Sequence, residues 1–134
     1  MDHPIDLTRL PRSVRLGRDA CGRAELTYLD ERFLPGEERF CSTGSWREVV
    51  DAIKTLAVRG APAIGAAGAA AVALWAVNEG ARGAVSHGCA EAGESFLAEL
   101  RPVAAEISAA RPTAVNLMWA TARMESLAKR LVAE

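Results

Sequence analysis

Apolar and polar residues alternate along the first part of the chain with the period of two that is typical of half-buried strands. Residues 14–17 read valine, arginine, leucine, glycine, and residues 24–29 continue the alternation. Asp19–Gly22 carries turn-forming residues between these two runs, and a short third strand is expected at residues 39–41. The pattern predicts a small antiparallel sheet of about three strands over residues 13–43.

Two four-residue signals mark the end of this sheet and the start of the helices. The segment from Leu34 to Glu37 reads Leu-Pro-Gly-Glu and matches a type II turn, which takes proline second and glycine third. The segment from Ser45 to Glu48 matches a capping box, in which the serine caps a helix and the glutamate reaches back to the serine N–H. The first helix is therefore expected to begin at Ser45.

Apolar residues recur at helical spacing over the rest of the chain. The first helix is expected to end near Val58, and the second to run from about Pro62 to Asn78. The second helix is apolar nearly all round, which indicates burial at the centre of a bundle. A third helix is expected from about Ser86, and Pro102 interrupts it with either a kink or a break.

The fourth helix is expected to open at Pro112 and to run toward the end of the chain. Core packing is the default prediction for the apolar residues of this helix and for the three tryptophans of the chain. These core candidates are Val115, Leu117, Met118, Met124, Leu127 and Leu131, with Trp46, Trp75 and Trp119.

The chain has 134 residues, enough for a single domain with one modest core. Half of it is hydrophobic, and its low aromatic content favours closely packed helices over a β-sandwich. The predicted fold class is α+β, mostly α, in a single domain after a flexible lead-in at residues 1–12. The small antiparallel sheet occupies residues 13–43, and a bundle of about four helices occupies residues 44–134.

The formal net charge is −1, so no overall field draws the chain to nucleic acid or to an anionic membrane surface. Neither partner is expected, and any anion site must be local. The three cysteines, Cys21, Cys41 and Cys89, show neither zinc-ligand spacing nor a disulfide framework, which favours the cytoplasm. No metal or cofactor is expected, and the N-terminus lacks the pattern of a signal peptide.

The segment Val58-Arg-Gly-Ala-Pro-Ala-Ile-Gly65 is the strongest candidate for a binding site. Pro62 suits the first position of a helix, where an N–H has no helical partner. The free N–H groups of a helix start are partly positive. Gly60 and Ala61 would let a ligand approach the backbone, and Arg59 adds a full charge. The segment therefore predicts a pocket for phosphate or carboxylate.

A second segment, Arg111-Pro112-Thr113, repeats the arrangement of an arginine before a helix-opening proline. If both helix starts converge, one phosphate could be held by two guanidinium groups and several backbone N–H groups. The alternative for each segment is a tight turn between helices with a solvated arginine, which is the commoner structure. Spacing alone leaves the two interpretations open.

The other polar residues offer no catalytic arrangement above chance. Asp30 and Glu31 adjoin a turn and are expected to be solvated, and His3 and His87 are expected at the surface. Each cysteine is expected to act as a small apolar packing residue. From the residues alone the chain is a helical domain with one candidate anion pocket and no evident reactive group.

Taken together and in order, the motifs resemble methylthioribose-1-phosphate isomerase. The segments that carry the resemblance are Tyr28-Leu29-Asp30, Leu34-Pro35, Ala52-Ile53-Lys54, Val58 to Gly65, and Arg111 to Ala120. The resemblance extends over about residues 13–130. This family shares a superfamily with ribose-1,5-bisphosphate isomerase and with the regulatory subunits of translation initiation factor 2B.

The resemblance implies the N-terminal domain of an aldose–ketose isomerase that converts 5-methylthioribose 1-phosphate to 5-methylthioribulose 1-phosphate in methionine salvage. Arg59, Gly60, Ala61 and Arg111 match family residues that contact the sugar-phosphate substrate. The family's catalytic cysteine and aspartate belong to a C-terminal Rossmann-like domain, which is expected to be absent from this chain. No residue here is therefore expected to be catalytic, and the isolated chain is expected to be inactive. Family members usually dimerise, so a homodimer is a further expectation.

Three alternatives stay open. The first is a non-catalytic binding module of the initiation-factor-2B type, and the second is a domain of a ribose-1,5-bisphosphate isomerase. The third is a stand-alone helical interaction domain whose arginine motifs serve only packing. The sequence departs from the family at Glu31, where the family often has glutamine, and at Pro102 inside an expected helix.

Overall fold

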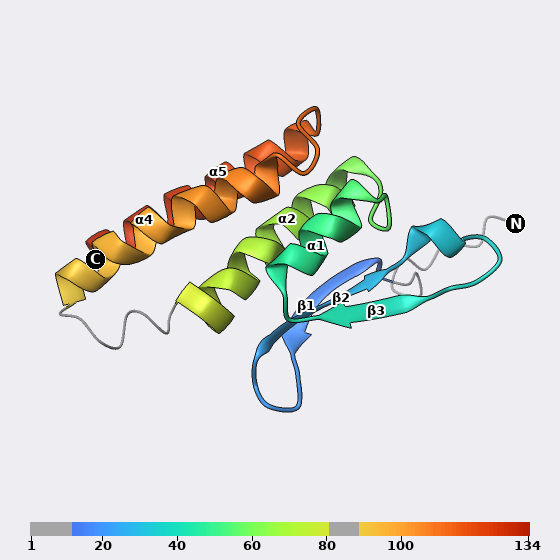
Figure 1. Ribbon diagram of the computed structural model, residues 1–134, viewed down its shortest axis with the longest axis horizontal. Helices are drawn as coiled ribbons and strands as arrows, with labels where there is room; N and C mark the ends of the chain where they lie inside the picture. Colours follow the sequence, from blue (N-terminus) through green and yellow to red (C-terminus); the bar gives the residue numbers. More distant parts are fainter. Residues whose placement is uncertain (1–11, 81–88) are drawn as a thin grey trace, which may run out of the picture.

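The computed structural model describes residues 12–80 and 89–134, in the predicted order of sheet first and helices after. Figure 1 shows three layers: the sheet, then α1 with α2, then α4 with α5. The predicted fold class, α+β and mostly α, is confirmed, whereas the predicted lead-in at residues 1–12 lies almost wholly outside the described residues. The elements are β1 (Val14–Arg18), β2 (Ala24–Leu29), a 3-10 turn η2 (Glu31–Phe33), β3 (Phe40–Thr43), α1 (Trp46–Lys54), α2 (Ala61–Trp75), a π-helical turn η3 (Ala76–Gly80), α4 (Cys89–Ser108) and α5 (Val115–Ala133).

The sheet is antiparallel, with β2 between β1 and β3. Leu26 in the middle of β2 pairs with Leu16 on one side and with Thr43 on the other. Leu26 is fully buried, because this face of the sheet packs against α2. The predicted turn between the first two strands is also confirmed, since the Gly22 N–H donates to the Asp19 carbonyl over 3.0 Å.

The predicted type II turn at Leu34–Glu37 is wrong. That turn needs a positive φ at its third residue, which Gly36 does not adopt. The chain instead reverses through η2, and the Glu37 N–H donates to the Phe33 carbonyl over 3.0 Å. This reversal brings η2 next to the connection between α1 and α2.

The first helix starts where predicted but is capped differently. Ser45 is the N-cap residue of α1, yet its hydroxyl makes no capping hydrogen bond. The Thr43 hydroxyl accepts from the Ser45 N–H over 3.0 Å and donates to the Glu48 carboxylate. The predicted capping box is therefore wrong. Glu48 bonds to the hydroxyl of Thr43 at the end of β3, and not to the N–H of Ser45.

α1 ends at Lys54, four residues before the predicted end at Val58. The Thr55 N–H still bonds to the Asp51 carbonyl over 2.9 Å, but Leu56 adopts a φ of 63°, in the left-handed region. That conformation ends the helix and opens the loop that carries Arg59.

α2 is the central helix of the fold and contacts α1, α4, α5 and two strands. By length and composition Ala61–Gly80 could cross a membrane. Its most apolar stretch of 18 residues has a mean hydropathy of 1.5, but 56% of that stretch is buried inside the fold. This burial matches the prediction of a helix at the centre of a bundle. Nine residues of α2 are buried, among them Ile64, Gly65, Gly68 and Leu74.

A buried asparagine, which the sequence analysis did not single out, joins the end of this long helix to the sheet. The Asn78 side chain donates to the Ala24 carbonyl over 2.9 Å and to the Gly44 carbonyl over 3.0 Å. Its Oδ1 accepts from the Ala24 N–H over 3.0 Å. All of its bonds go to backbone groups, so Asn78 fixes the angle at which the sheet lies against α2.

α4 is continuous through Pro102, so the proline does not break the helix. The predicted start near Ser86 lies outside the described residues. Gly93 of α4 lies against Val132 of α5, where a Cβ on the glycine would overlap the valine. The start of α4 therefore meets the end of α5, and these two helices are antiparallel.

α5 begins at Val115, three residues after the predicted opening at Pro112. The Ala114 N–H donates to the Arg111 carbonyl over 3.0 Å, which makes residues 111–114 a turn rather than the first turn of the helix. Of the predicted core residues of this helix, Leu117 is fully buried and Met124 is partly buried. The prediction of core packing is wrong for the other five residues, because each is exposed: Val115, Met118, Trp119, Leu127 and Leu131.

Candidate anion site at two helix starts

α2 and α5 lie side by side and run in the same direction. A Cβ on Gly65 would come 3.2 Å from the Asn116 carbonyl oxygen, and a Cβ on Gly68 would overlap the Leu117 side chain. The second turn of α2 therefore lies against the first turn of α5. Figure 1 shows the two connections that precede them at the same end of the molecule.

The start of α2 leaves backbone N–H groups free. Gly60 is the N-cap residue with a φ of 84°, and no side chain caps the helix. The first helical hydrogen bond runs from the Ile64 N–H to the Gly60 carbonyl over 2.9 Å. Pro62 has no N–H, so Ala61 and Ala63 carry the unpaired donors of the first turn. Gly60 and Ala61 are exposed, which leaves this end of the helix open to a ligand.

Arg59 lies in the loop between α1 and α2, and its side chain is exposed. The Arg59 Nε donates to the Leu56 carbonyl over 2.9 Å, which folds the side chain back along its own loop. The Arg59 backbone N–H donates to Glu31 Oε2 over 2.7 Å. The terminal nitrogens of the guanidinium have no hydrogen-bond partner among the described residues.

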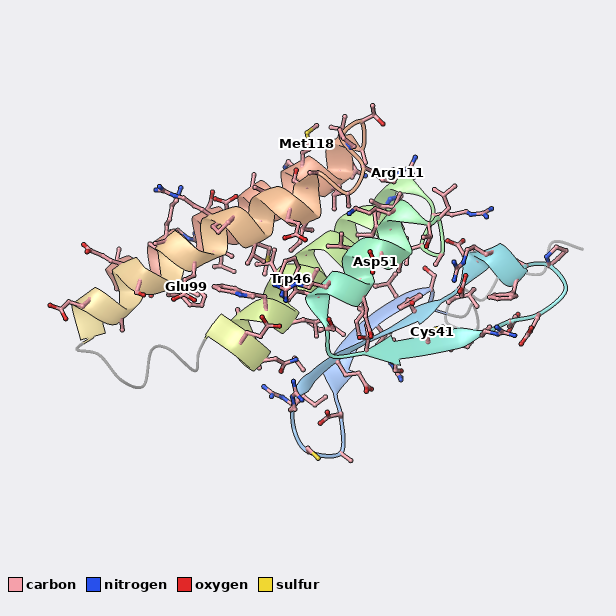
Figure 2. The ribbon with its side chains drawn as sticks, viewed as in Figure 1. Cys41, Trp46, Asp51, Glu99, Arg111 and Met118 are labelled. Atoms are coloured by element: carbon pink, nitrogen blue, oxygen red, sulfur yellow. The ribbon has the colours of Figure 1, made fainter. Side chains whose placement is uncertain are left out.

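Arg111 occupies the turn before α5 and is half-buried. Figure 2 shows it at the end of the helical layers where α5 begins, with Met118 nearby in the first turns of that helix. The N-cap residue of α5 is Ala114, which has no side-chain acceptor for the free N–H groups. The two predicted arginines thus precede two adjacent helix starts, and neither start is neutralised by a capping side chain.

An apolar cavity of about 640 Å³ opens between α2 and α5 beside these starts. Pro62 and Val115, from the first turns, line it together with Trp119. The Trp119 side chain is 62% exposed, and the Arg123 guanidinium lies 5.3 Å from its ring centroid. This groove could not be predicted from the sequence, because helical periodicity does not distinguish a core residue from one that lines an open groove.

The acidic segment between β2 and η2 is not solvated as predicted. Asp30 is buried, and the Arg32 guanidinium holds its carboxylate through bonds of 2.8 Å from Nε and 2.6 Å from Nη2. The hydrogen bonds from Arg32 lower the pKa of Asp30 below its ordinary value of 3.8, against the opposing effect of burial. Glu31 is partly exposed and reaches the Arg59 loop.

None of the described side chains forms a reactive cluster. Cys21 is exposed and Cys41 is partly buried, so neither packs as a buried apolar residue. Cys41 pairs with Tyr28 across the sheet, and burial together with this thiol raises the pKa of Tyr28 to about 12. Within residues 12–80 and 89–134 there is no group of acidic, histidine or cysteine side chains that could hold a metal ion. The guanidinium and free N–H groups at the two helix starts are donors suited to an anion, and the described residues place no nucleophile or general base beside them.

Comparison with known proteins gives close relatives. No family model matches the chain. The chain is 45% identical over 104 residues to methylthioribose-1-phosphate isomerase from Geobacter metallireducens, a match that covers 78% of this chain and 28% of that protein. The crystal structure of 5-methylthioribose 1-phosphate isomerase from Pyrococcus horikoshii superposes with a TM-score of 0.76 at 32% identity, over 99% of this chain and 33% of that one.

The chain is a homologue of methylthioribose-1-phosphate isomerases. Subunit delta of translation initiation factor eIF-2B from A. fulgidus also matches, with a TM-score of 0.59 and 28% identity over 91% of this chain, which places both in one superfamily. The chain spans about 28% of the length of the curated isomerases that it matches. The relatives from Geobacter metallireducens and Pyrococcus horikoshii are isomerases, whereas subunit delta is part of a translation factor.

We predict that the Asp30–Arg32 ion pair stabilises the fold above pH 4 and is lost in acid. Because the folded-state pKa is lowered, the stabilisation is present above the unfolded value of 3.8 and disappears as the pH falls through the folded value. Because the carboxylate that is lost is buried and bonded to Arg32, we expect Asp30→Asn to lower the free energy of unfolding at pH 7. Urea unfolding at pH 7 and pH 3 measures the free energy of unfolding of the variant and the wild type. A difference between the two free energies that does not shrink in acid would contradict the prediction.

Proposed function

We propose that this chain is the N-terminal part of an isomerase that converts 5-methylthioribose 1-phosphate to 5-methylthioribulose 1-phosphate in methionine salvage. In this proposal Arg59, Gly60, Ala61 and Arg111 bind the phosphate of the substrate. The single observation that carries it is the contact between the starts of α2 and α5, made by Gly65 and Gly68 with Asn116 and Leu117, each helix being preceded by one of the two arginines. The homology to isomerases supports the assignment of the substrate.

Electrostatics supports phosphate as the ligand. The chain has a formal net charge of −1, so a positive site must come from local groups. Two uncapped helix starts each contribute a partial positive charge, and the two guanidinium groups add full charges. In the proposed complex the guanidinium of Arg59 turns from the Leu56 carbonyl toward the phosphate. The free N–H groups of Ala61 and Val115 complete the site.

The apolar groove favours a methylthio sugar over a bisphosphate. 5-Methylthioribose 1-phosphate has a charged end and an apolar end. The groove lined by Pro62, Val115 and Trp119 lies directly beside the proposed phosphate site. A second phosphate would lose its hydration on the apolar part of this surface, where Arg123 is the one cationic side chain among the lining residues, so ribose-1,5-bisphosphate is the less favoured substrate. A binding module of the initiation-factor type remains the second candidate, because subunit delta of that factor has the same fold.

The chemical step is proposed to use groups outside residues 1–134. The described residues hold no nucleophile or base beside the two helix starts, so the proposed role of this chain is to bind and orient the sugar phosphate. The remaining part of the enzyme is its proposed partner, together with a second copy in a homodimer, and the cytoplasm is its proposed location.

We predict that the purified 134-residue chain does not turn over 5-methylthioribose 1-phosphate. The assay follows formation of the ketose product over hours at high protein concentration. A full-length isomerase such as that of Geobacter metallireducens serves as the positive control. Turnover by the purified chain at a rate comparable with this control would show that the reacting groups lie within it.

Replacement of either arginine should impair the full-length enzyme. A charge-assisted hydrogen bond to phosphate contributes roughly 1.5–3 kcal/mol, so Arg59→Ala and Arg111→Ala should each lower kcat/KM more than about tenfold. Arg101→Ala, an exposed arginine on α4, is the matched control and should stay within about twofold. The binding role of Arg59 or Arg111 fails if its variant matches the control.

A further inference from the structure

Glu31 bonds at two points to the loop between α1 and α2, which carries Arg59. Its backbone N–H donates to the Ala57 carbonyl over 2.9 Å, and its carboxylate Oε2 accepts from the Arg59 N–H over 2.7 Å. The two bonds join η2 to residues 57–59, although 28 positions separate Glu31 from Arg59 in the sequence. The sheet side of the molecule thereby sets the position of the loop between α1 and α2.

This contact falls where the loop has least support of its own. The first half of the loop bonds back to α1, since the Val58 N–H donates to the Ala52 carbonyl over 3.2 Å. Beyond Gly60 the helical bonds of α2 begin. Leu56 and Gly60 both adopt positive φ and bracket the segment, so the backbone changes direction on each side of Arg59. Among the described residues, the bond to Glu31 is the only hydrogen bond of the Arg59 N–H.

Glu31 is itself held firmly by its neighbour. The Asp30 N–H donates to the Arg39 carbonyl over 2.7 Å, and the Asp30 carboxylate is buried and bonded to Arg32. These bonds fix the backbone immediately before Glu31. The carboxylate of Glu31 therefore reaches the loop from a rigid base, as a positioning group requires.

We propose that Glu31 is a positioning residue, whose carboxylate orients Arg59, Gly60 and Ala61 for the substrate phosphate. This rests on the proposed function of these residues. Glu31 does not touch the phosphate in this account. It occupies the Arg59 N–H, so the ligand is left with the guanidinium and the N–H groups that follow it. Ordering the segment before the ligand arrives reduces the entropy lost on binding.

The test compares two neutral side chains of similar length in the full-length enzyme. Glu31→Gln keeps a hydrogen-bond acceptor, whereas Glu31→Met has none of comparable strength. Both substitutions remove the negative charge. The ratio of kcat/KM between the two variants therefore isolates the hydrogen bond from the electrostatic effect on a phosphate ligand. Glu38→Ala, an exposed carboxylate with no hydrogen bond or ion pair among the described contacts, is the control for surface charge.

We expect Glu31→Met to have a kcat/KM about threefold to tenfold below that of Glu31→Gln, which corresponds to the loss of one hydrogen bond. Hydrogen exchange in the peptide covering residues 56–61 should be faster in Glu31→Met than in Glu31→Gln, and exchange in α4 should be equal. Glu31→Ala repeats the comparison with a shorter side chain, and every assay is run well below the unfolding midpoints.

Equal kcat/KM in the two variants, or equal exchange at residues 56–61, would overturn the inference. Arg59→Ala, measured in parallel, separates this result from failure of the proposed function. If Arg59→Ala is impaired while Glu31→Met equals Glu31→Gln, the phosphate site stands and the positioning role of Glu31 is wrong. If Arg59→Ala is unimpaired, the segment has no role in substrate binding and both proposals fail.

Discussion

The close parallel approach of α2 and α5 is the constraint on which the candidate site depends. Gly65 and Gly68 make it possible, because any side chain there would meet Asn116 or Leu117. Glycine inside a helix costs roughly 1 kcal/mol relative to alanine, so contact between the helices must offset two unfavourable positions. The approach brings two helix starts to one end of the fold, each with an arginine just before it.

Buried polar groups hold the sheet in the position that this helix pair requires. Asn78 at the end of the long central helix bonds to backbone groups of the sheet and of the turn before α1. At the other end of the sheet, Glu31 joins η2 to the loop that carries Arg59, and the bonds of Asp30 to Arg32 and Arg39 hold the backbone before it. The sheet contributes no residue to the proposed phosphate site. Its proposed role is to fix the loop that carries Arg59.

Those parts of the structure that rest on local periodicity could be predicted from the sequence. Alternation located the strands, and the apolar run after Pro62 located the central helix. The hydrogen bonds at the start of α1 could not be predicted, because the strand residue Thr43, and not the N-cap residue Ser45, bonds to Glu48. The exposure of Trp119 was also missed, since spacing shows which residues share a helix face but not whether another element covers it.

The arginine motifs were identified from the sequence, but their relation to Glu31 was not. The only signal was its departure from the glutamine that the family often has at this position. Glutamate and glutamine both offer an oxygen acceptor, so the substitution is compatible with the bond to the Arg59 N–H.

The central claim is that one phosphate binds across both helix starts. A crystal structure of the full-length enzyme with 5-methylthioribose 1-phosphate tests it most directly. The account predicts the phosphate within hydrogen-bond distance of the Arg59 and Arg111 guanidinium groups and of the Ala61 N–H, and a phosphate bound away from either helix start would contradict it.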